Sequence, residues 1–221
     1  MDKVIYYKGL VGSRLFHSNR EDSDYDYWIV TREENVPYYQ AELPKRESIA
    51  GMQFGKYNDY FYYSPEKIMT LLFADIPPSS VSGAHNYLIE GLFSDPEEAT
   101  PFGQWLIANR EAIILANRPL FGHILLRLTK HALSIPYNFS PKMLVKAWTY
   151  LKLYIGYANG TCTFKETMDN LIRDNAFIKK VQMLQYSNLD ILEELQKLFQ
   201  EAHAYEDFWN SPVDTEQNQR L

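Results

Sequence analysis

The sequence predicts an α+β protein, in which a small mixed β-sheet domain is followed by an α-helical domain. Short runs rich in aromatic and β-branched residues occupy the first third of the chain, and such runs favour strands. Beyond residue 98 the apolar residues recur at spacings of three and four, which favours helices. Ser94, Asp95 and Pro96 punctuate the change. We therefore expect domains at residues 1–98 and 99–209, and a flexible tail at residues 210–221.

The first domain is expected to contain three strands. Their apolar and aromatic runs lie at residues 4–11, 25–31 and 57–63. Ser64 followed by Pro65 predicts a helix start, because serine caps helix N-termini and proline suits the first helical position. The expected helical pieces are a turn from residue 13 onward, a helix at residues 65–74 and a helix at residues 85–93. Two proline-containing segments, residues 32–50 and 77–80, are expected to be connections with at most short elements.

The second domain is expected to be entirely helical. The periodic segments are residues 102–117, 120–134, 141–157, 164–174 and 189–205. The last of them places Leu192, Leu195, Phe199 and Ala202 on one face.

Charge and cysteine content restrict the function. The 221 residues carry a formal net charge of −6, which argues against a general nucleic-acid binder and leaves room for a local basic groove. Cys162 is the one cysteine, so neither a disulfide framework nor a cysteine metal site is expected. No signal-peptide pattern and no apolar run of about 20 residues is present, so we expect a cytoplasmic protein without a membrane span.

The most informative stretch runs from Gly12 to Asp26. Side chains alternate along a strand, so Asp24 and Asp26 should point to the same side. Two carboxylates on one side suit Mg²⁺, which takes further ligands from substrate phosphates. Gly12 allows the backbone to approach a phosphate closely, and Ser13 offers an N–H and a hydroxyl. The stretch therefore predicts a phosphate cradle beside a metal site, as a nucleoside triphosphate (NTP) requires.

The same stretch resembles the motif of the DNA polymerase beta superfamily of nucleotidyltransferases. Small members of that superfamily carry Gly-Ser-Arg followed, at this spacing, by Ser-Asp-x-Asp, and here these are residues 12–14 and 23–26. Residues 7–14 and 59–67 are also similar to a bacterial and phage group related to RNA-repair-associated nucleotidyltransferases. One difference is His17, which stands where the small members usually have glycine.

The resemblance implies a reaction and a set of residues. An acceptor would attack the α-phosphate of an NTP bound with Mg²⁺ or Mn²⁺, and pyrophosphate would leave. Residues 1–98 would form the catalytic domain. Asp24, Asp26 and a third carboxylate would be the catalytic metal ligands, and the nucleotide would be bound by Gly12, Ser13, Arg14 and Lys142.

Asp59 is the candidate for the third carboxylate. A two-metal site needs one more acidic ligand that reaches the acceptor hydroxyl. Asp59 lies in an aromatic strand where a charge is otherwise hard to explain, and the resemblance implies that this strand neighbours the Asp24–Asp26 strand. The alternative is a charge that protects the edge strand of a sheet from aggregation.

The sequence allows more than one role for Arg14 and for His17. Arg14 could contact the triphosphate, or it could pair with Glu21 or Asp22. His17 could be a loop surface residue, a contact to phosphate or acceptor, or a metal ligand, the last being disfavoured because Mg²⁺ prefers oxygen.

A basic stretch without Asp or Glu runs from Arg118 to Lys152. Helical spacing puts His123, Arg127 and either Lys130 or His131 on one face, and Lys142 and Lys146 on another. These faces predict where a triphosphate or a nucleic-acid acceptor binds, and the alternative is a solvated surface. Within the stretch, the resemblance extends securely to Lys142 alone.

The acceptor and the rival functions remain open from the sequence. An RNA or tRNA end is the first choice of acceptor, a protein side chain the second and a small molecule the third. Metal-dependent glycosyltransferases also use Asp-x-Asp, but they have no need for the upstream Gly-Ser. A non-catalytic nucleotidyltransferase-like module, such as an antitoxin that binds a toxin, would keep the fold without the chemistry.

Overall fold

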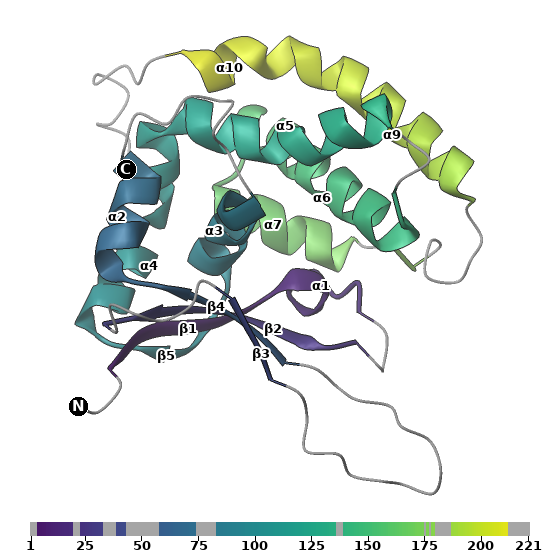
Figure 1. Cartoon of the computed structure of the whole chain (residues 1–221). Coiled ribbons are helices and arrows are strands. Elements are labelled where there is room, and N and C mark those ends of the chain that lie inside the picture. The colour runs from purple at the N-terminus through teal and green to yellow at the C-terminus, as the bar shows by residue number, and fades with distance from the viewer. Residues whose placement is uncertain are drawn as a thin grey trace, which may run out of the picture. The chain divides into compact units, whose positions relative to one another are not determined.

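The computed structural model describes residues 4–19, 23–32, 39–42, 58–73, 83–135, 139–174, 176, 178–179 and 187–211 (Figure 1). The chain divides into two compact units. The first comprises Met1–Ile76 and Ser82–Arg110, and the second comprises Pro77–Val81 and Glu111–Leu221. The predicted α+β class is confirmed, because a mixed sheet lies in the first unit and the described part of the second is helical.

The sheet of the first unit has five strands in the order β3-β4-β2-β1-β5. Their bounds are β1 Ile5–Val11, β2 Tyr25–Thr31, β3 Tyr39–Glu42, β4 Asn58–Tyr63 and β5 Pro96–Ala99. The β2–β4 pair is parallel, and the other three pairs are antiparallel. The three predicted strands are confirmed, whereas β3 and β5 were not predicted. Residue 57, the first of the third predicted strand, lies outside the described residues.

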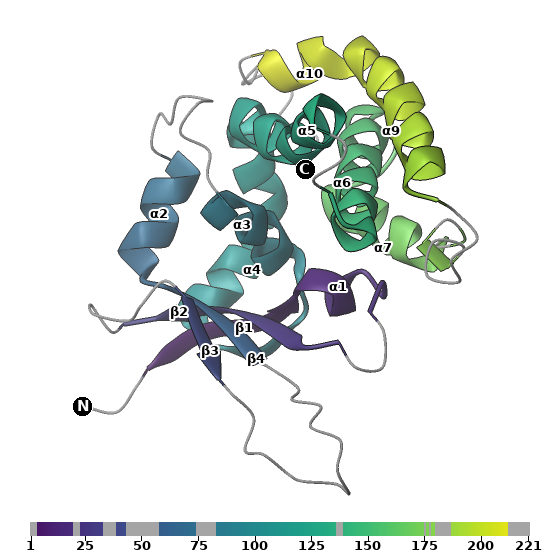
Figure 2. The same ribbon diagram turned by 45° about the vertical axis from the view of Figure 1, so that its right-hand side comes forward.

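Helices lie on one side of this sheet (Figure 2). They are α1 Gly12–Leu15, α2 Pro65–Phe73, α3 Gly83–Phe93 and the start of α4 Pro101–Ala116. Trp28 of β2 is fully buried on this side, and a Cβ at Gly91 of α3 would lie 2.1 Å from its ring. The backbone of α3 therefore rests directly on the centre of the sheet.

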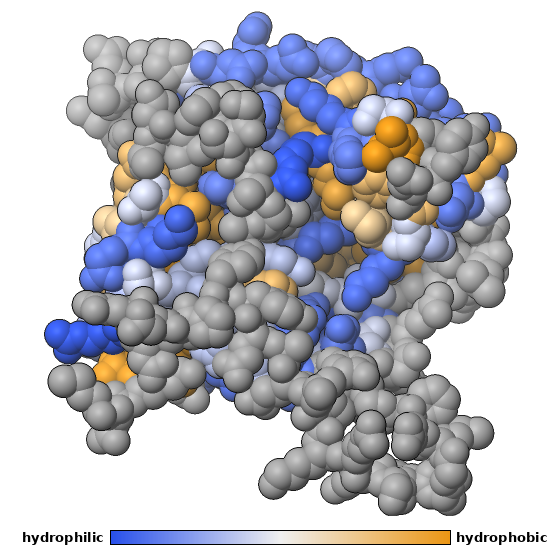
Figure 3. Space-filling view, in the orientation of Figure 1, coloured by the Kyte–Doolittle hydropathy of each residue, from blue (hydrophilic) through white to orange (hydrophobic). Residues whose placement is uncertain are grey.

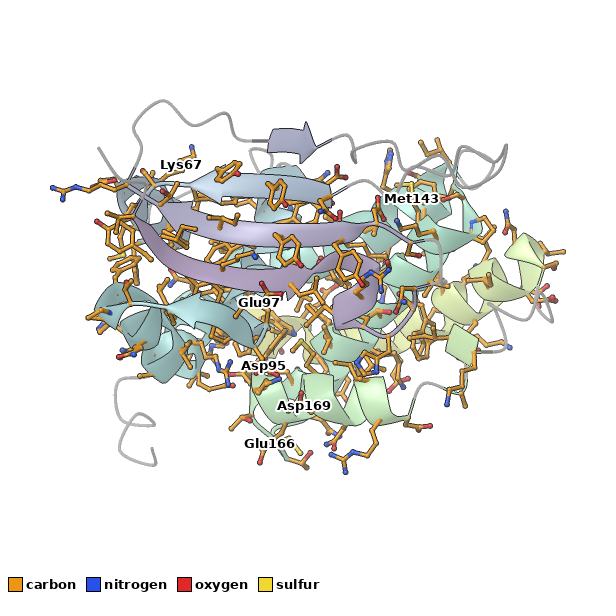
Figure 4. The ribbon with its side chains drawn as sticks, turned by 90° about the horizontal axis from the view of Figure 1, so that it is seen from below. Lys67, Asp95, Glu97, Met143, Glu166 and Asp169 are labelled. Atoms are coloured by element: carbon orange, nitrogen blue, oxygen red, sulfur yellow. The ribbon has the colours of Figure 1, made fainter. Side chains whose placement is uncertain are left out.

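The opposite side of the sheet carries a row of stacked tyrosines on β2 and β4. Tyr27 of β2 stacks on Tyr60 of β4, with 5.6 Å between the ring centroids. Lys8 of β1 lies 4.4 Å above the Tyr27 ring and forms an ion pair with Glu97 of β5, which Figure 4 labels. These contacts join four strands on that side.

The first unit extends further along the chain than the expected boundary at residue 98. Residues 96–99 form β5, which pairs with β1, although Pro96 was taken as a break. A Cβ at Gly103 would lie 2.3 Å from the carbonyl oxygen of Tyr6, so the first turn of α4 packs tightly on β1. Long-range pairing thus keeps this segment with the sheet, and the division falls inside α4, after Arg110.

The described part of the second unit consists of helices whose bounds lie close to the predicted ones. These are the end of α4, α5 Arg118–Ser134, α6 Pro141–Ala158, α7 Phe164–Arg173, α9 Asn188–Ala202, the 3₁₀ turn η3 His203–Tyr205 and α10 Glu206–Asn210. Ser140, Thr163 and Ser187 accept N-terminal amide hydrogens of α6, α7 and α9 as N-caps. The five predicted helices are confirmed.

The apolar face of α9 differs slightly from the prediction. Its buried residues are Ile191, Leu195, Leu198 and Ala202, whereas Leu192 and Phe199 are half-buried. Figure 3 shows hydrophilic residues along the outer side of α9 and α10. The helix is therefore amphipathic, as predicted, with its buried stripe rotated by about one residue.

No helix among the described residues combines the length and apolarity needed to cross a bilayer. The predicted break at residues 77–80 and residues 212–221 of the predicted tail lie outside the described residues.

Candidate metal and phosphate site

Three carboxylates from two neighbouring strands meet at one end of the sheet. Asp24 immediately precedes β2, Asp26 is its second residue, and Asp59 is the second residue of β4. The parallel register pairs Asp26 directly with Asp59. One oxygen from each of the three side chains lies within 4.8 Å of the others. We call these three residues the carboxylate cluster.

The carboxylate cluster is accessible and has the chemistry of a hard-cation site. Asp26 is 7% exposed, whereas Asp24 and Asp59 are half-buried. Three carboxylate oxygens suit Mg²⁺ or Mn²⁺, which prefer oxygen ligands. Three negative charges this close repel one another, so a bound cation would relieve the repulsion.

Asp59 does not lie at an edge of the sheet. Its strand, β4, is flanked by β2 on one side and by β3 on the other. The alternative interpretation of Asp59 as a protective charge on an edge strand is therefore wrong. The structure also meets the expectation that β4 neighbours the strand of Asp24 and Asp26.

Gly12 brings the backbone against the carboxylate cluster. The antiparallel register pairs Val11 with Asp26, so the next residue, Gly12, turns over that aspartate. Gly12 has φ +72°, and a Cβ there would lie 2.1 Å from Asp26 Oδ2. Any other residue would be strained by the backbone conformation and would collide with the carboxylate.

Ser13 follows Gly12 in the first turn of α1. Its side chain is 8% exposed, and within the described residues its Oγ is buried without a hydrogen-bond partner. An unsatisfied buried hydroxyl destabilises a protein by about 1–3 kcal/mol, so such groups commonly mark a bound water, ion or substrate. Ser13 directly follows Gly12, the residue whose backbone lies against Asp26.

Arg14 supports the loop that carries Asp24. Its Nε donates to the Asp24 carbonyl (2.9 Å) and its Nη2 to the Ser23 carbonyl (2.5 Å). The guanidinium also lies 3.7 Å from the centre of the Tyr25 ring. Glu21 and Asp22, the expected partners for an ion pair, lie outside the described residues, and a contact of Arg14 with a triphosphate stays a prediction. The arginine orients Asp24 through its backbone.

His17 occupies a backbone conformation that favours glycine. It is exposed and has φ 51°, and its N–H donates to the Arg14 carbonyl at the end of α1. Left-handed backbone is uncommon for residues with a side chain. A glycine at this place, as the resemblance leads us to expect, would thus have a conformational explanation, and His17 adopts the left-handed backbone at some strain.

We expect His17→Gly to leave the free energy of unfolding unchanged or to raise it by up to about 1 kcal/mol. Glycine removes the left-handed strain, and the greater freedom of the unfolded chain offsets part of that gain. His17→Val should lower the free energy of unfolding by more than about 1 kcal/mol, because a β-branched residue tolerates this conformation poorly. Urea unfolding of the two variants measures both, and equal stability of the two would contradict a strained turn.

A fourth carboxylate, Glu90 of α3, was not predicted. It is fully buried, and its Oε2 accepts the backbone N–H of Gly12 at 2.6 Å. Its neighbours Leu88, Ile89, Leu92 and Phe93 are all buried. A charged residue amid this apolar run is a sign in the sequence that could have indicated it, but only the fold connects α3 with Gly12.

Lys142 and the basic stretch belong to the second unit. Lys142 is exposed on the first turn of α6, and Lys146 one turn later lies 5.5 Å from the Tyr150 ring centre. On α5, burial lowers the pKa of His123, and the charges of Lys130 and Arg127 lower it further. His123, Arg127 and Lys130 stand at positions i, i+4 and i+7 of α5 and so share a face, as predicted.

Comparison with known proteins adds no family to this site: no protein-family model matches the chain, and no curated protein matches it. The functional interpretation therefore depends on the geometry and chemistry of the residues themselves.

Proposed function

We propose that the chain is a metal-dependent nucleotidyltransferase. It would transfer a nucleoside monophosphate from an NTP to an acceptor and release pyrophosphate, using Mg²⁺ or Mn²⁺. The resemblance to the DNA polymerase beta superfamily suggested this reaction, and the carboxylate cluster beside an unsatisfied serine hydroxyl supports it.

The observation that carries the proposal is the combination of these two features. A carboxylate cluster alone could bind a structural cation. Ser13 adds a buried hydroxyl that lacks an acceptor, next to a glycine pressed against Asp26. A triphosphate satisfies both at once, since its oxygens accept from the hydroxyl and complete the coordination of a cation.

The chain's own residues would mainly position the two substrates and hold the cation that neutralises phosphate charge. Asp24, Asp26 and Asp59 would hold the cation, which when bound neutralises phosphate charge and lowers the pKa of the acceptor hydroxyl. Ser13 would donate its hydroxyl to the outer phosphates. Asp59, half-buried on β4, would take the proton from the acceptor hydroxyl. The acceptor oxygen bonds to the α-phosphorus, the bond to the bridging oxygen breaks, and pyrophosphate leaves.

An RNA or tRNA end is the proposed acceptor, and a protein side chain is the second choice. The cationic side chains of Arg127 and Lys130 on α5 support a polyanionic acceptor in a chain whose net charge is −6. The cytoplasm stays the proposed location, because a chain with one cysteine has no disulfide framework.

Labelling by each NTP in turn tests the proposal. The purified chain is incubated with α-labelled ATP, GTP, CTP or UTP, with Mg²⁺ or Mn²⁺, and with total RNA or cell protein. Label on RNA or on a protein band supports the proposal and identifies the acceptor. No label in any combination, from a preparation that binds the cation, would instead favour the non-catalytic module.

Charge reversal on the basic stretch should weaken acceptor use. We expect Arg127→Glu or Lys142→Glu to raise the acceptor KM several-fold and to reduce the slope of log affinity against log salt by about one, because each removes a phosphate contact. The NTP KM should change less. Lys197→Glu on the exposed side of α9 is the matched control. An unchanged acceptor KM and salt slope in both variants would show that these faces are only solvated surface.

A further inference from the structure

Glu90 is a buried charge that the proposed chemistry does not use. It lies in the last turn of α3 and has no exposed surface. A carboxylate in such surroundings is unfavourable unless strong hydrogen bonds compensate for the lost water. Leucine or isoleucine would be expected at this position, as at Leu88 and Ile89 beside it.

Hydrogen bonds and packing contacts hold the segment that carries Glu90 against the sheet. The Tyr7 hydroxyl of β1 donates to the carbonyls of Gly91 (2.9 Å) and Ser94 (2.8 Å). Burial raises the pKa of Tyr7 to about 12, so the hydroxyl remains a donor at neutral pH. On the other side, Gly91 rests on Trp28. These contacts leave little freedom for the end of α3.

Glu90 uses this rigid base to hold Gly12. Its Oε2 accepts the Gly12 N–H at 2.6 Å. The other side of Gly12 faces Asp26 Oδ2. The peptide is thus held between two carboxylates, in a left-handed conformation that fixes where the following Ser13 points.

We propose that Glu90 is a positioning residue that holds the Gly12 peptide so that the Ser13 hydroxyl faces the phosphates of the substrate. The inference rests on the proposed function, because it assigns Ser13 to a triphosphate. It predicts that Glu90 acts on triphosphate binding and not on the cation, since Glu90 hydrogen-bonds the backbone before Ser13 and lies outside the carboxylate cluster.

The test compares Glu90→Gln, Glu90→Ala and the control Ile89→Val. Glutamine keeps an oxygen that accepts from Gly12, alanine removes it, and valine loosens the packing of α3 without touching Gly12. Two affinities are measured for each variant: that for Mn²⁺ alone, and that for the four α,β-methylene NTP analogues, which resist attack at the α-phosphorus, in the presence of Mg²⁺.

We expect Glu90→Ala to weaken binding of the analogue by about tenfold or more, and Glu90→Gln by a smaller factor, because a neutral acceptor restores part of the bond. Mn²⁺ affinity should stay within about twofold of wild type in both, and Ile89→Val should bind both ligands as wild type does. Hydrogen exchange at residues 12–13 should accelerate in Glu90→Ala. If Glu90→Ala does not fold, the analogue and Mn²⁺ affinities of Glu90→Gln are compared with those of Ile89→Val, and this comparison tests the role of Glu90.

Other results overturn the inference in distinguishable ways. If wild type binds an analogue and the Glu90 variants bind it equally well, Glu90 is merely structural and the proposed function stands. The same holds if the Glu90 variants lose analogue affinity and Mn²⁺ affinity together. If wild type binds Mn²⁺ but none of the four analogues, the proposed function fails and the role of Glu90 fails with it.

Discussion

Asp24→Ala and Asp26→Ala should each lower nucleotide transfer by more than about a thousandfold. Loss of one carboxylate leaves the cation without enough ligands, and electrostatic stabilisation of the transferring phosphate is the largest catalytic contribution in such a site. The melting temperature should be unchanged or slightly raised, because a member of a repelling cluster is removed.

The measurement is label transfer from the α-labelled NTP, together with Mn²⁺ affinity and a thermal melt. Asp95→Ala is the matched control, because this aspartate is exposed in the same unit and lies outside the carboxylate cluster. Wild-type transfer by either cluster variant, in a preparation free of other polymerases, would exclude the assignment of the site.

Asp59→Asn should separate binding from chemistry. We expect the variant to keep Mg-triphosphate binding through Asp24 and Asp26, and to lose about 10²–10⁴-fold in the rate of transfer, the usual contribution of a positioned general base. The amide stays close to the aspartate in size, so the parallel pairing of Asp26 with Asp59 should persist.

Single-turnover kinetics and the affinity for an α,β-methylene analogue give the two quantities. Glu97→Gln serves as control, because it neutralises a carboxylate on β5 whose partner is Lys8 and which is not part of the carboxylate cluster. If analogue affinity falls as steeply as the rate, Asp59 is chiefly a cation ligand, and the proton must be accepted elsewhere.

Local sequence patterns were enough to predict most of the helices and the side of the strand on which the first two carboxylates lie. A strand alternates its side chains, so the spacing of Asp24 and Asp26 alone placed both on one side of β2. Apolar spacings of three and four predicted the five helices α4, α5, α6, α7 and α9. Both kinds of inference need only residues a few positions apart, which is why they succeed without the fold.

The partners of the site depended on the tertiary structure. Asp59 stands opposite Asp26 because β2 and β4 run parallel in one register, and a shift by one residue would turn Asp59 to the tyrosine side of the sheet. The resemblance suggested that the strand of Asp59 neighbours the strand of Asp26. Only the fold showed that these two residues stand directly opposite each other. In the same way β5 was mistaken for a boundary, because a four-residue strand is stabilised by its pairing with β1 and not by its own composition.

The roles of Arg14 and Glu90 show the same limit most clearly. Arg14 binds two backbone carbonyls, which carry no side-chain pattern, so the sequence could only suggest partners of opposite charge. Glu90 reaches Gly12 across 78 positions of the chain, after α3 has packed on Trp28 and Tyr7. The sequence by itself determined which residues could do chemistry, and the packing of distant segments decided which of them meet, because hydrogen bonds to backbone and buried contacts depend on three-dimensional proximity.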